Sequence, residues 1–400
     1  MTAPADVRRG AIAVFVIFAL NGVAVATWIS RLPTVRDILG LDVSQVGILI
    51  AGLSVGSIFG LFAASPIVHR FGARLTIVGT LVVGSLGIGG MTIATSVLPV
   101  YAFAIGSMAV FGFAWSMCDV AMNVEGTVVE RASGRTLMPW FHASWSLGSV
   151  LGAGIGAAAA FGGIVPSIHF AAIGVLLLVA ALFFPRLMPA KIGSNAEGSV
   201  EGAVEPKPTF REQLGVWKEP RTLLIGVLVL GMAFAEGSAN DWLTIAMVDD
   251  RGLDAGQGAL LFGVFSVAMT IGRIAGVPLL DRFGRVPVLR VSVLAAALGL
   301  GAVILLPSIP VTVVAIVIWG LGAALGFPVG MSAAGDDPSR AAARVSAVAT
   351  IAYCAFLVGP PIIGFVGHQI GILNALWIVF GLIVIAGLAV PAARERVARG

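Results

Sequence analysis

The feature that most limits how this chain can fold is a series of twelve long apolar stretches. Each can cross the roughly 30 Å hydrocarbon core of a bilayer as a helix that rises about 1.5 Å per residue. Lipid offers backbone polar groups no other partners, and the short alternating segments of a β-barrel are missing. Only 11% of the residues are charged, which argues against a soluble domain. The sequence therefore predicts an all-α integral membrane protein with twelve transmembrane helices, near residues 10–30, 45–68, 74–95, 98–127, 138–161, 166–187, 220–246, 257–280, 287–306, 309–332, 342–367 and 372–391.

The distribution of basic residues predicts the orientation of these spans. Loops that stay in the cytoplasm retain Lys and Arg. With both termini cytoplasmic, most of the 24 basic residues lie on the inner side, except Arg31, Arg36 and Arg251 in outer loops and Arg273 within a span. We therefore expect a multi-pass protein of a bacterial inner (plasma) membrane. The net charge of +4 follows from this bias and indicates no nucleic-acid partner.

The Cys and His residues do not form the clusters that metal or nucleophile chemistry requires. Cys118 and Cys354 lie in separate spans, and the four His residues are scattered over the chain. There is also no nucleotide-binding motif. We expect no cofactor, no metal and no enzymatic activity. A membrane-embedded enzyme and a non-transporting receptor are less favoured alternatives.

A polar stretch divides the chain into two similar halves. We interpret residues 188–219 as a cytoplasmic linker, residues 1–187 as an N-terminal six-helix bundle and residues 220–400 as a C-terminal one. The segment Pro66–Gly72 (PIVHRFG) recurs 212 positions later as Pro278–Gly284 (PLLDRFG). A duplicated six-helix unit is the economical explanation, which makes the bundles pseudo-symmetric.

Both copies of this segment fall in the short inner loop after the second span of their half. The second copy resembles the loop signature of the major facilitator superfamily, Gly-x-x-x-Asp-Arg-x-Gly-Arg. The first copy departs from it, with His69 and Ala73 where the family has Asp and Arg. The resemblance implies residues that gate the cytoplasmic side, although a generic charged turn is the alternative. These are Arg70, Asp281, Arg282 and Arg285.

The span 98–127 carries the densest group of polar residues. Trp115, Asp119 and Asn123 are spaced four apart and therefore share one helix face. An ionisable residue at mid-membrane costs about 2.5 to 3.5 kcal/mol, so such residues are expected to line a cavity or to be paired. This face is a candidate site for a polar solute, and a structural contact between helices is the alternative.

Two narrower resemblances concern the substrate. The stretch from Asp119 to Asn123 is similar to an acidic-x-x-x-Asn segment of the proton-coupled fucose permease group, which implies that Asp119 is a proton-coupling carboxylate. The acid of that group's first helix has no counterpart here. A nearer resemblance is to the branch that includes the rhizopine transporter, and it implies an inositol-amine-like or other polyol substrate. Its residues lie in 28–33, 119–126, 141–148, 236–237 and 241–242.

The remaining candidates surround a proposed path through both halves. Arg273 needs an anion, which could be Asp119, Glu236 or an anionic substrate; a permanent ion pair is the alternative reading. We expect Asp119, Glu236 and Arg273 to couple protons. Glu125 and His142 could pair near the cytoplasmic gate, although a packing role for His142 is equally open. Solute contacts are expected from Asn21, Trp28, Trp115, Asn123, Asn240 and Asp241, with an interfacial position as the alternative for Asp241.

Together these features favour a secondary active transporter of a small polar solute, such as a sugar, polyol or amino sugar. It would work as a monomer by alternating access, with protons as the coupling ion and the lipid bilayer as its surroundings. The alternative is a proton-coupled exporter of drugs or metabolites.

Overall fold

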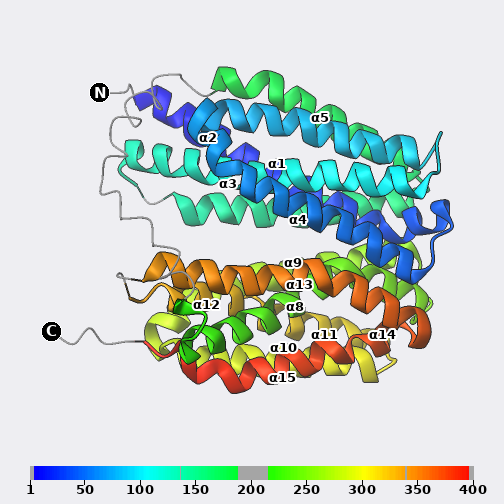
Figure 1. Ribbon diagram of the computed structural model, residues 1–400. Helices are drawn as coiled ribbons and strands as arrows, with labels where there is room; N and C mark the ends of the chain where they lie inside the picture. The colour runs from blue at the N-terminus through cyan, green and yellow to red at the C-terminus, as the bar shows by residue number, and fades with distance from the viewer. Residues whose placement is uncertain (1–3, 136, 188–214, 338–339, 396–400) are drawn as a thin grey trace. The chain divides into compact units, whose positions relative to one another are not determined.

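The computed structural model describes residues 4–135, 137–187, 215–337 and 340–395, and every element in these ranges is helical (Figure 1). The chain divides into two compact units, residues 1–204 with 254–260, and residues 205–253 with 261–400. The first unit contains α1 (Pro4–Leu39), α2 (Val43–Ala94), α3 (Tyr101–Ser133), α4 (Met138–Phe161) and α5 (Pro166–Leu187). Most of the expected linker, residues 188–214, lies outside the described residues.

The second unit contains the remaining helices. Its longer elements are α8 (Pro220–Asp249), α9 (Ala255–Phe283), α10 (Arg285–Leu305), α11 (Ile309–Ala323), α12 (Gly326–Ala334) and α13 (Ala341–Ile370). The chain then continues through α14 (Ile372–Ala375), α15 (Trp377–Ala389) and the 3-10 helix η1 (Val390–Ala393). The first residues of α9, up to Leu260, group with the first unit.

Eleven helical segments in the described ranges are long and apolar enough to cross a membrane. The expected spans 45–68 and 74–95 fall in one of them, α2, whose 52 residues correspond to about 78 Å of helix. Gly72 interrupts α2 with a non-helical backbone, φ 79° and ψ 156°. Large apolar side chains also remain exposed along the segments, for example Phe62 at 77% and Leu388 at 79%, as lipid-facing side chains do.

The sequence repeat has a matching backbone in each unit. Gly284 has φ 75° and ψ 171°, close to the values of Gly72, and only glycine enters this region without strain. The preceding Arg–Phe pair also repeats: the Arg70 guanidinium lies 5.4 Å from the Phe71 ring centroid, and that of Arg282 lies 5.2 Å from Phe283. The two copies therefore share a turn as well as a sequence.

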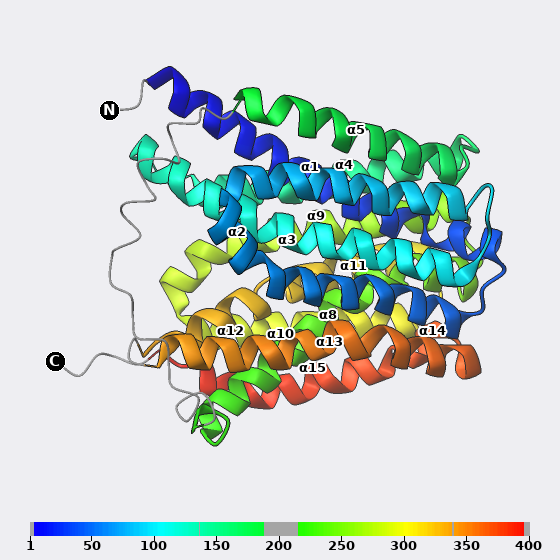
Figure 2. The ribbon, with the colours of Figure 1, turned by 45° about the horizontal axis from the view of Figure 1, so that its top comes forward.

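Glycines allow helices of the first unit to approach closely. Gly148, Gly152 and Gly156 of α4 face α1, and a Cβ added at Gly148 would lie 2.1 Å from the Ala19 carbonyl oxygen. At Gly156 it would lie 1.9 Å from Ser30 Oγ. Figure 2 shows α1 and α4 side by side. This close contact between α1 and α4 places the polar residues of α1 next to those of α3 and α4.

Helix α8 lies against α13, α15 and α12 in the second unit. Its residues from Ala235 to Met247 are mostly buried, and Trp242 is fully buried. Helix α13 contains Pro360 and Pro361 in its interior. Because proline has no N–H, each removes one backbone hydrogen bond to the residue four positions earlier.

Candidate functional site

The polar face of α3 carries a carboxylate without a hydrogen bond in the described part of the chain. Trp115, Asp119 and Asn123 are all half-buried on this helix. The Asn123 side chain donates back to the Asp119 carbonyl at 2.7 Å, which leaves the Asp119 carboxylate itself unengaged. The Trp115 Nε1 is buried and, within the described ranges, has no acceptor. This face could therefore offer a bound solute one hydrogen-bond acceptor, the Asp119 carboxylate, and one donor, the Trp115 indole N–H.

Asn21 ties α1 to α3 and α4. Its Nδ2 donates to the Trp115 carbonyl at 3.4 Å, and its Oδ1 accepts the Trp145 Nε1 hydrogen at 2.9 Å. Trp28 is buried on the same helix, with 3% of its surface exposed. Asn21, one of the expected solute contacts, is thus hydrogen-bonded to the backbone of Trp115 and to the side chain of Trp145.

The first unit also contains a buried arginine, Arg31, which the sequence analysis placed in an outer loop. Arg31 lies within α1 instead of an outer loop, and only 1% of its surface is exposed. Its guanidinium donates to the carbonyls of Gly156, in the last turns of α4, and of Ile164, just after that helix. The C-terminal end of a helix carries partial negative charge, which stabilises the buried cation. Nearby His169 is buried, and neither ring nitrogen has a partner among the described residues.

The buried Glu125 interacts electrostatically with Arg74, which follows the first copy of the repeated loop. His142, the partner considered from the sequence, is exposed and packs edge-on against Phe18 with ring centroids 5.3 Å apart. Whether His142 also reaches Glu125 stays a prediction.

The same pair of charges occurs in the second unit. Arg285 follows the second copy of the loop, and its Nη1 donates to Asp336 Oδ1 at 2.6 Å. Arg74 and Glu125 are each 211 positions before Arg285 and Asp336, one fewer than the 212 of the loop itself. One extra residue, Ala73, therefore separates Gly72 from the arginine that corresponds to Arg285. The first copy keeps the signature's second arginine, shifted by one position.

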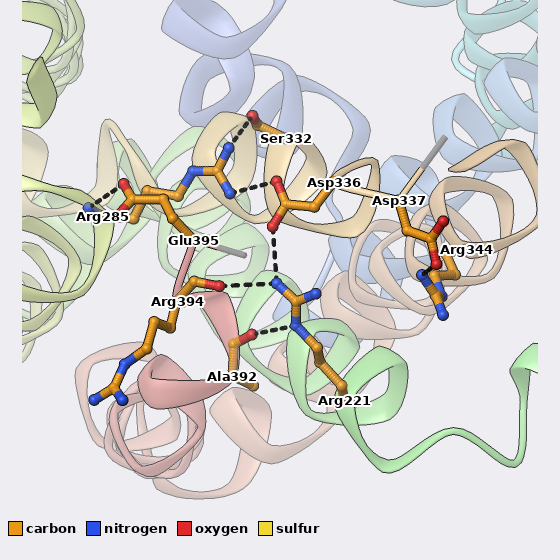
Figure 3. A network of polar contacts seen from close by, with 9 residues as sticks. All are labelled: Arg221, Arg285, Ser332, Asp336, Asp337, Arg344, Ala392, Arg394 and Glu395. Atoms are coloured by element: carbon orange, nitrogen blue, oxygen red, sulfur yellow. Dashed lines mark hydrogen bonds and ion pairs between the residues drawn. The ribbon is translucent and has the colours of Figure 1, made fainter. Parts of the chain in front are cut away.

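Asp336 organises a larger network in the second unit (Figure 3). Its second oxygen accepts from Arg221 Nη2 at 2.8 Å, and Arg285 Nη2 donates to Ser332 Oγ at 3.1 Å. The Glu395 carboxylate accepts the backbone N–H of Arg285 at 3.1 Å. We call these five residues the Asp336 network. It joins the starts of α8 and α10 to the end of α12 and to the residues after η1.

A second ionic group lies at the start of α8. Glu219 accepts from Arg344 Nε at 2.6 Å and from Arg340 Nη1 at 2.8 Å. Arg344 also donates to Asp337 at 2.8 Å. The hydrogen bond from Arg344 and then that from Arg340 lower the pKa of Glu219 to about 2, from an ordinary value of 4.5.

Sequence reasoning missed Asp336, Arg221 and Glu219. The constant separation between the two Arg–acid pairs is the signal that could have identified Asp336. The other gating candidates, Asp281, Arg282 and Arg70, are exposed.

Of the three anions considered for Arg273, the structure places Glu236 beside it. Arg273 Nη2 of α9 lies 3.1 Å from Glu236 Oε1 of α8. Their side chains are 33% and 18% exposed. The two residues of the second unit that were expected to couple protons therefore neutralise each other's charge.

Asp241 lies five residues after Glu236 on α8, at a hollow between α8 and α13. The hollow has an empty volume of about 210 Å³, open solvent included. Neighbouring Asn240 is half-buried. The residues that line the hollow are Phe234, Gly237, Ser238, Asp241, Trp242, Ala355, Gly359, Pro360 and Ile363. In the described ranges, this hollow included, no group of three or more His, Cys, Asp or Glu residues could hold a metal ion.

Comparisons with known proteins match nearly the whole chain. The family model for the Major Facilitator Superfamily matches residues 10–354 and 233–399. An uncharacterised MFS-type transporter of Yersinia pestis is 29% identical over 383 residues, 96% of this chain and 94% of that protein. The membrane protein MosC of Rhizobium meliloti is 25% identical over 375 residues, 93% and 87% of the two chains.

Solved structures show the same fold. The nucleoside transporter NupG has a TM-score of 0.75 at 15% identity, over 96% of this chain and 98% of that one. The Escherichia coli fucose:proton symporter FucP has a TM-score of 0.63 at 16% identity, over 96% and 98%. The resemblances stated from the sequence are confirmed, and the members of the superfamily whose model matches this chain are transporters and not enzymes. The chain therefore belongs to the major facilitator superfamily.

Proposed function

We propose that this protein is a secondary active transporter that couples a small polar solute to protons by alternating access. The solute class is a sugar, a polyol or an amino sugar. The observation that carries this proposal is the state of the Asp119 carboxylate, which no hydrogen bond or ion pair engages among the described residues. Glu236, by contrast, is already paired with Arg273.

A carboxylate inside a membrane span is costly as an anion, by about 2.5 to 3.5 kcal/mol on insertion scales. Taking up a proton removes that charge, and a helix movement that exposes the group to water releases the proton again. Asp119 therefore has the chemistry of a proton carrier. The Glu236–Arg273 pair would contribute by changing partners as the helices move, because either charge would need a new counter-charge when separated.

The solute would meet an aromatic wall and an amide beside this carboxylate. Trp115 offers its ring and an unused indole N–H, and Asn123 lies one turn beyond Asp119. Hydroxyl groups can donate to a carboxylate and accept from an indole N–H, so a polyhydroxylated solute suits this face. Similarity to a fucose:proton symporter supports both the solute class and the coupling ion. Further solute contacts are proposed for Asn21, Trp28, Asn240 and Asp241.

We assign gating to the repeated loops and the charges that follow them. In each unit the pair links the arginine that follows the repeated turn to an acidic residue of another segment, Arg74 to Glu125 and Arg285 to Asp336. Arg70, Asp281, Arg282 and His142 complete the proposed gate. Such pairs can form in one state of a transporter and separate in another.

The proposed topology has twelve spans with both termini in the cytoplasm. Because α2 is more than twice the length of one span and breaks at Gly72, it accounts for two. The halves would be residues 1–187 and 220–400, with 188–219 as the linker. We propose that the protein acts as a monomer in a bacterial plasma membrane, where the distribution of Lys and Arg favours this orientation.

A thermal-shift screen of the purified protein tests the solute class. A bound solute stabilises the folded state, so the melting temperature rises with ligand concentration. We expect a rise with polyols or amino sugars that is lost in Trp115→Ala. A rise with lipophilic drugs and none with polyols would support the exporter instead and contradict the proposed solute class.

A further inference from the structure

We propose that Asp241 binds a regulatory proton in the hollow between α8 and α13, where it is held as a neutral carboxylic acid. The inference rests on the transport function proposed above and deepens it, because this proton is distinct from the one that Asp119 would carry. The hollow has room for about one water molecule at most. A proton bonded to the carboxyl group fits there, whereas the solute contact proposed for Asp241 requires the hollow to open first.

The surroundings of Asp241 are almost wholly apolar. Of the nine residues that line the hollow, only Asp241, Ser238 and Trp242 have a polar side-chain atom. Asp241 also lies eight residues, about 12 Å, before the end of α8 at Asp249, inside a segment long and apolar enough to cross a membrane. An ionised carboxylate in such surroundings loses the hydration that stabilises it in water.

Neither polar neighbour in the hollow stabilises a negative charge on Asp241. The Ser238 hydroxyl donates its hydrogen to the Ala235 carbonyl at 3.4 Å. The Trp242 Nε1 is buried and has no acceptor in the described part of the chain, so it does not donate to the carboxylate. Asp241 has no hydrogen bond or ion pair within that part either. An ionised carboxylate away from water needs such donors, whereas the neutral acid does not.

Among the described residues, no charge of opposite sign faces Asp241 from the helices that pack against α8. Of these helices, α11, α12, α14, α15 and η1 contain no Asp, Glu, Lys, Arg, His, Cys or Tyr. Helix α13 contributes only Ala, Gly, Pro and Ile residues to the lining. Its titratable residues, none of which lines the hollow, are Arg344, Tyr353, Cys354 and His368. The acidic neighbours on α8 itself, which add only negative charge, are Glu236 and Asp249.

The arginines around α8 bind other groups. Arg221, Arg273 and Arg344 each pair with an acid other than Asp241. Arg251, in the turn after α8, donates to two carbonyls at the end of α10. An ionised Asp241 would therefore be an uncompensated charge, and binding a proton removes that charge.

The hollow lies within one unit of the chain. Both helices that form it belong to the second unit. Opening the hollow therefore requires α8 and α13 to separate within that unit, which is a different movement from that of one unit against the other. We therefore assign to Asp241 a proton that controls the packing of these two helices, and not the transported one.

The prolines of α13 give the hollow a way to open. Pro360 lines the hollow and Pro361 follows it, and because proline has no N–H, α13 lacks two backbone hydrogen bonds at this point. Prolines are common places for helices to bend. When Asp241 loses its proton, only water can compensate the charge, so ionisation favours a bent α13 that admits water. The bound proton thus keeps α8 and α13 together, and alkaline conditions separate them.

The test is infrared spectroscopy of the full-length protein in detergent at neutral pH, without any solute. Carboxyl groups exposed to water are ionised at this pH, so only shielded acids give the C=O stretching band of a protonated carboxyl group. We expect such a band in the wild type, and Asp241→Asn should lose the absorption of one acid group. Asp249→Asn, an exposed carboxylate at the end of the same helix, is the matched control and should keep the band. Asp119→Asn, measured separately, identifies any share of Asp119.

Heating the same proteins tests the consequence for packing. The melting temperature of the wild type should fall as the pH is raised into the alkaline range, because the folded state loses the proton on Asp241. The amide in Asp241→Asn stays neutral at every pH, so the melting temperature of that variant should fall less.

The proposal is overturned if Asp241→Asn keeps the full protonated-acid band, or if both proteins lose stability equally at alkaline pH. A wild-type band that does not move in heavy water also overturns it, because a proton that never exchanges cannot regulate. Should Asp241→Asn fail to fold, Asp241→Glu decides, because a band that keeps its wild-type position in that variant does not arise at residue 241. These measurements need neither a solute nor a proton gradient. Their failure therefore leaves the transport proposal standing, and a failed solute screen leaves the Asp241 result standing.

Discussion

Glu236 and Arg273 join α8 to α9 through one ion pair, with 3.1 Å between the carboxylate oxygen and the guanidinium nitrogen. The pair is partly buried, so each charge has lost much of its hydration. Asp119, the third residue expected to take part in coupling, has no such partner among the described residues. The two units therefore differ in electrostatics, although they share a repeated loop with matching backbone.

Removing one member of this pair should destabilise the protein more than removing both charges. Arg273→Ala leaves Glu236 unpaired and should cost about 1 to 3 kcal/mol, less than a fully buried pair because Arg273 is a third exposed. The double variant Glu236→Gln with Arg273→Ala should lose less than Arg273→Ala alone, because neither charge is then left without its partner, and therefore less than the sum of the single changes. Denaturant unfolding in detergent measures all of these, and simple additivity would show that the two side chains do not interact.

Alanine at either repeated glycine should strain the turn. Gly72→Ala and Gly284→Ala each force an L-residue to combine a positive φ with an extended ψ, which costs about 1 to 3 kcal/mol. Gly79→Ala is the control, because Gly79 is helical and a Cβ there meets only open space. That change should be neutral or stabilise by up to about 1 kcal/mol. Equal melting temperatures for Gly72→Ala and Gly79→Ala would contradict the observed turn.

Acid should weaken the ionic group at the start of α8. Because folding lowers the pKa of Glu219 from 4.5 to about 2, its ionised form stabilises the folded state at higher pH. This stabilisation should disappear as the pH falls from about 4.5 toward about 2. Glu219→Gln should flatten that part of the melting-temperature profile against pH.

The two arginines on Glu219 should differ in their effects. The Arg344 side chain is 12% exposed, and its hydrogen bond is the largest cause of the lowered pKa of Glu219. The Arg340 side chain is 59% exposed. Arg344→Ala should therefore shift the acid transition more than Arg340→Ala, since exposed pairs contribute little. A larger shift in Arg340→Ala than in Arg344→Ala would contradict the assignment of the low pKa of Glu219 mainly to Arg344.

The spans were predictable from the sequence because length and hydropathy are local properties. Continuity through Gly72 was not, since a glycine turn inside an apolar stretch can be read as a loop or as a kink in one helix. The repeated loop was predictable from identical residues, and the structure adds its common backbone.

The ionic partners were less predictable because they are distant in the sequence. Arg273 had three candidate anions, and only the observed 3.1 Å contact with the Glu236 carboxylate selects one of them. Asp336 lies 51 positions after Arg285, and Glu219 lies 125 positions before Arg344. Neither separation follows from helical periodicity. That Trp115 and Asp119 lie on one helix face was predictable from their spacing, because residues four apart on a helix return to the same side. Their role in transport stays a prediction.

Proton coupling through Asp119 is tested most directly in proteoliposomes that contain a pH-sensitive dye. A gradient of the solute found in the thermal-shift screen should drive proton movement in the wild type and in the control Asp249→Asn. Asp119→Asn should fold and bind the solute normally, yet move no protons. Unchanged solute-driven proton flux in Asp119→Asn would contradict the coupling role of this carboxylate.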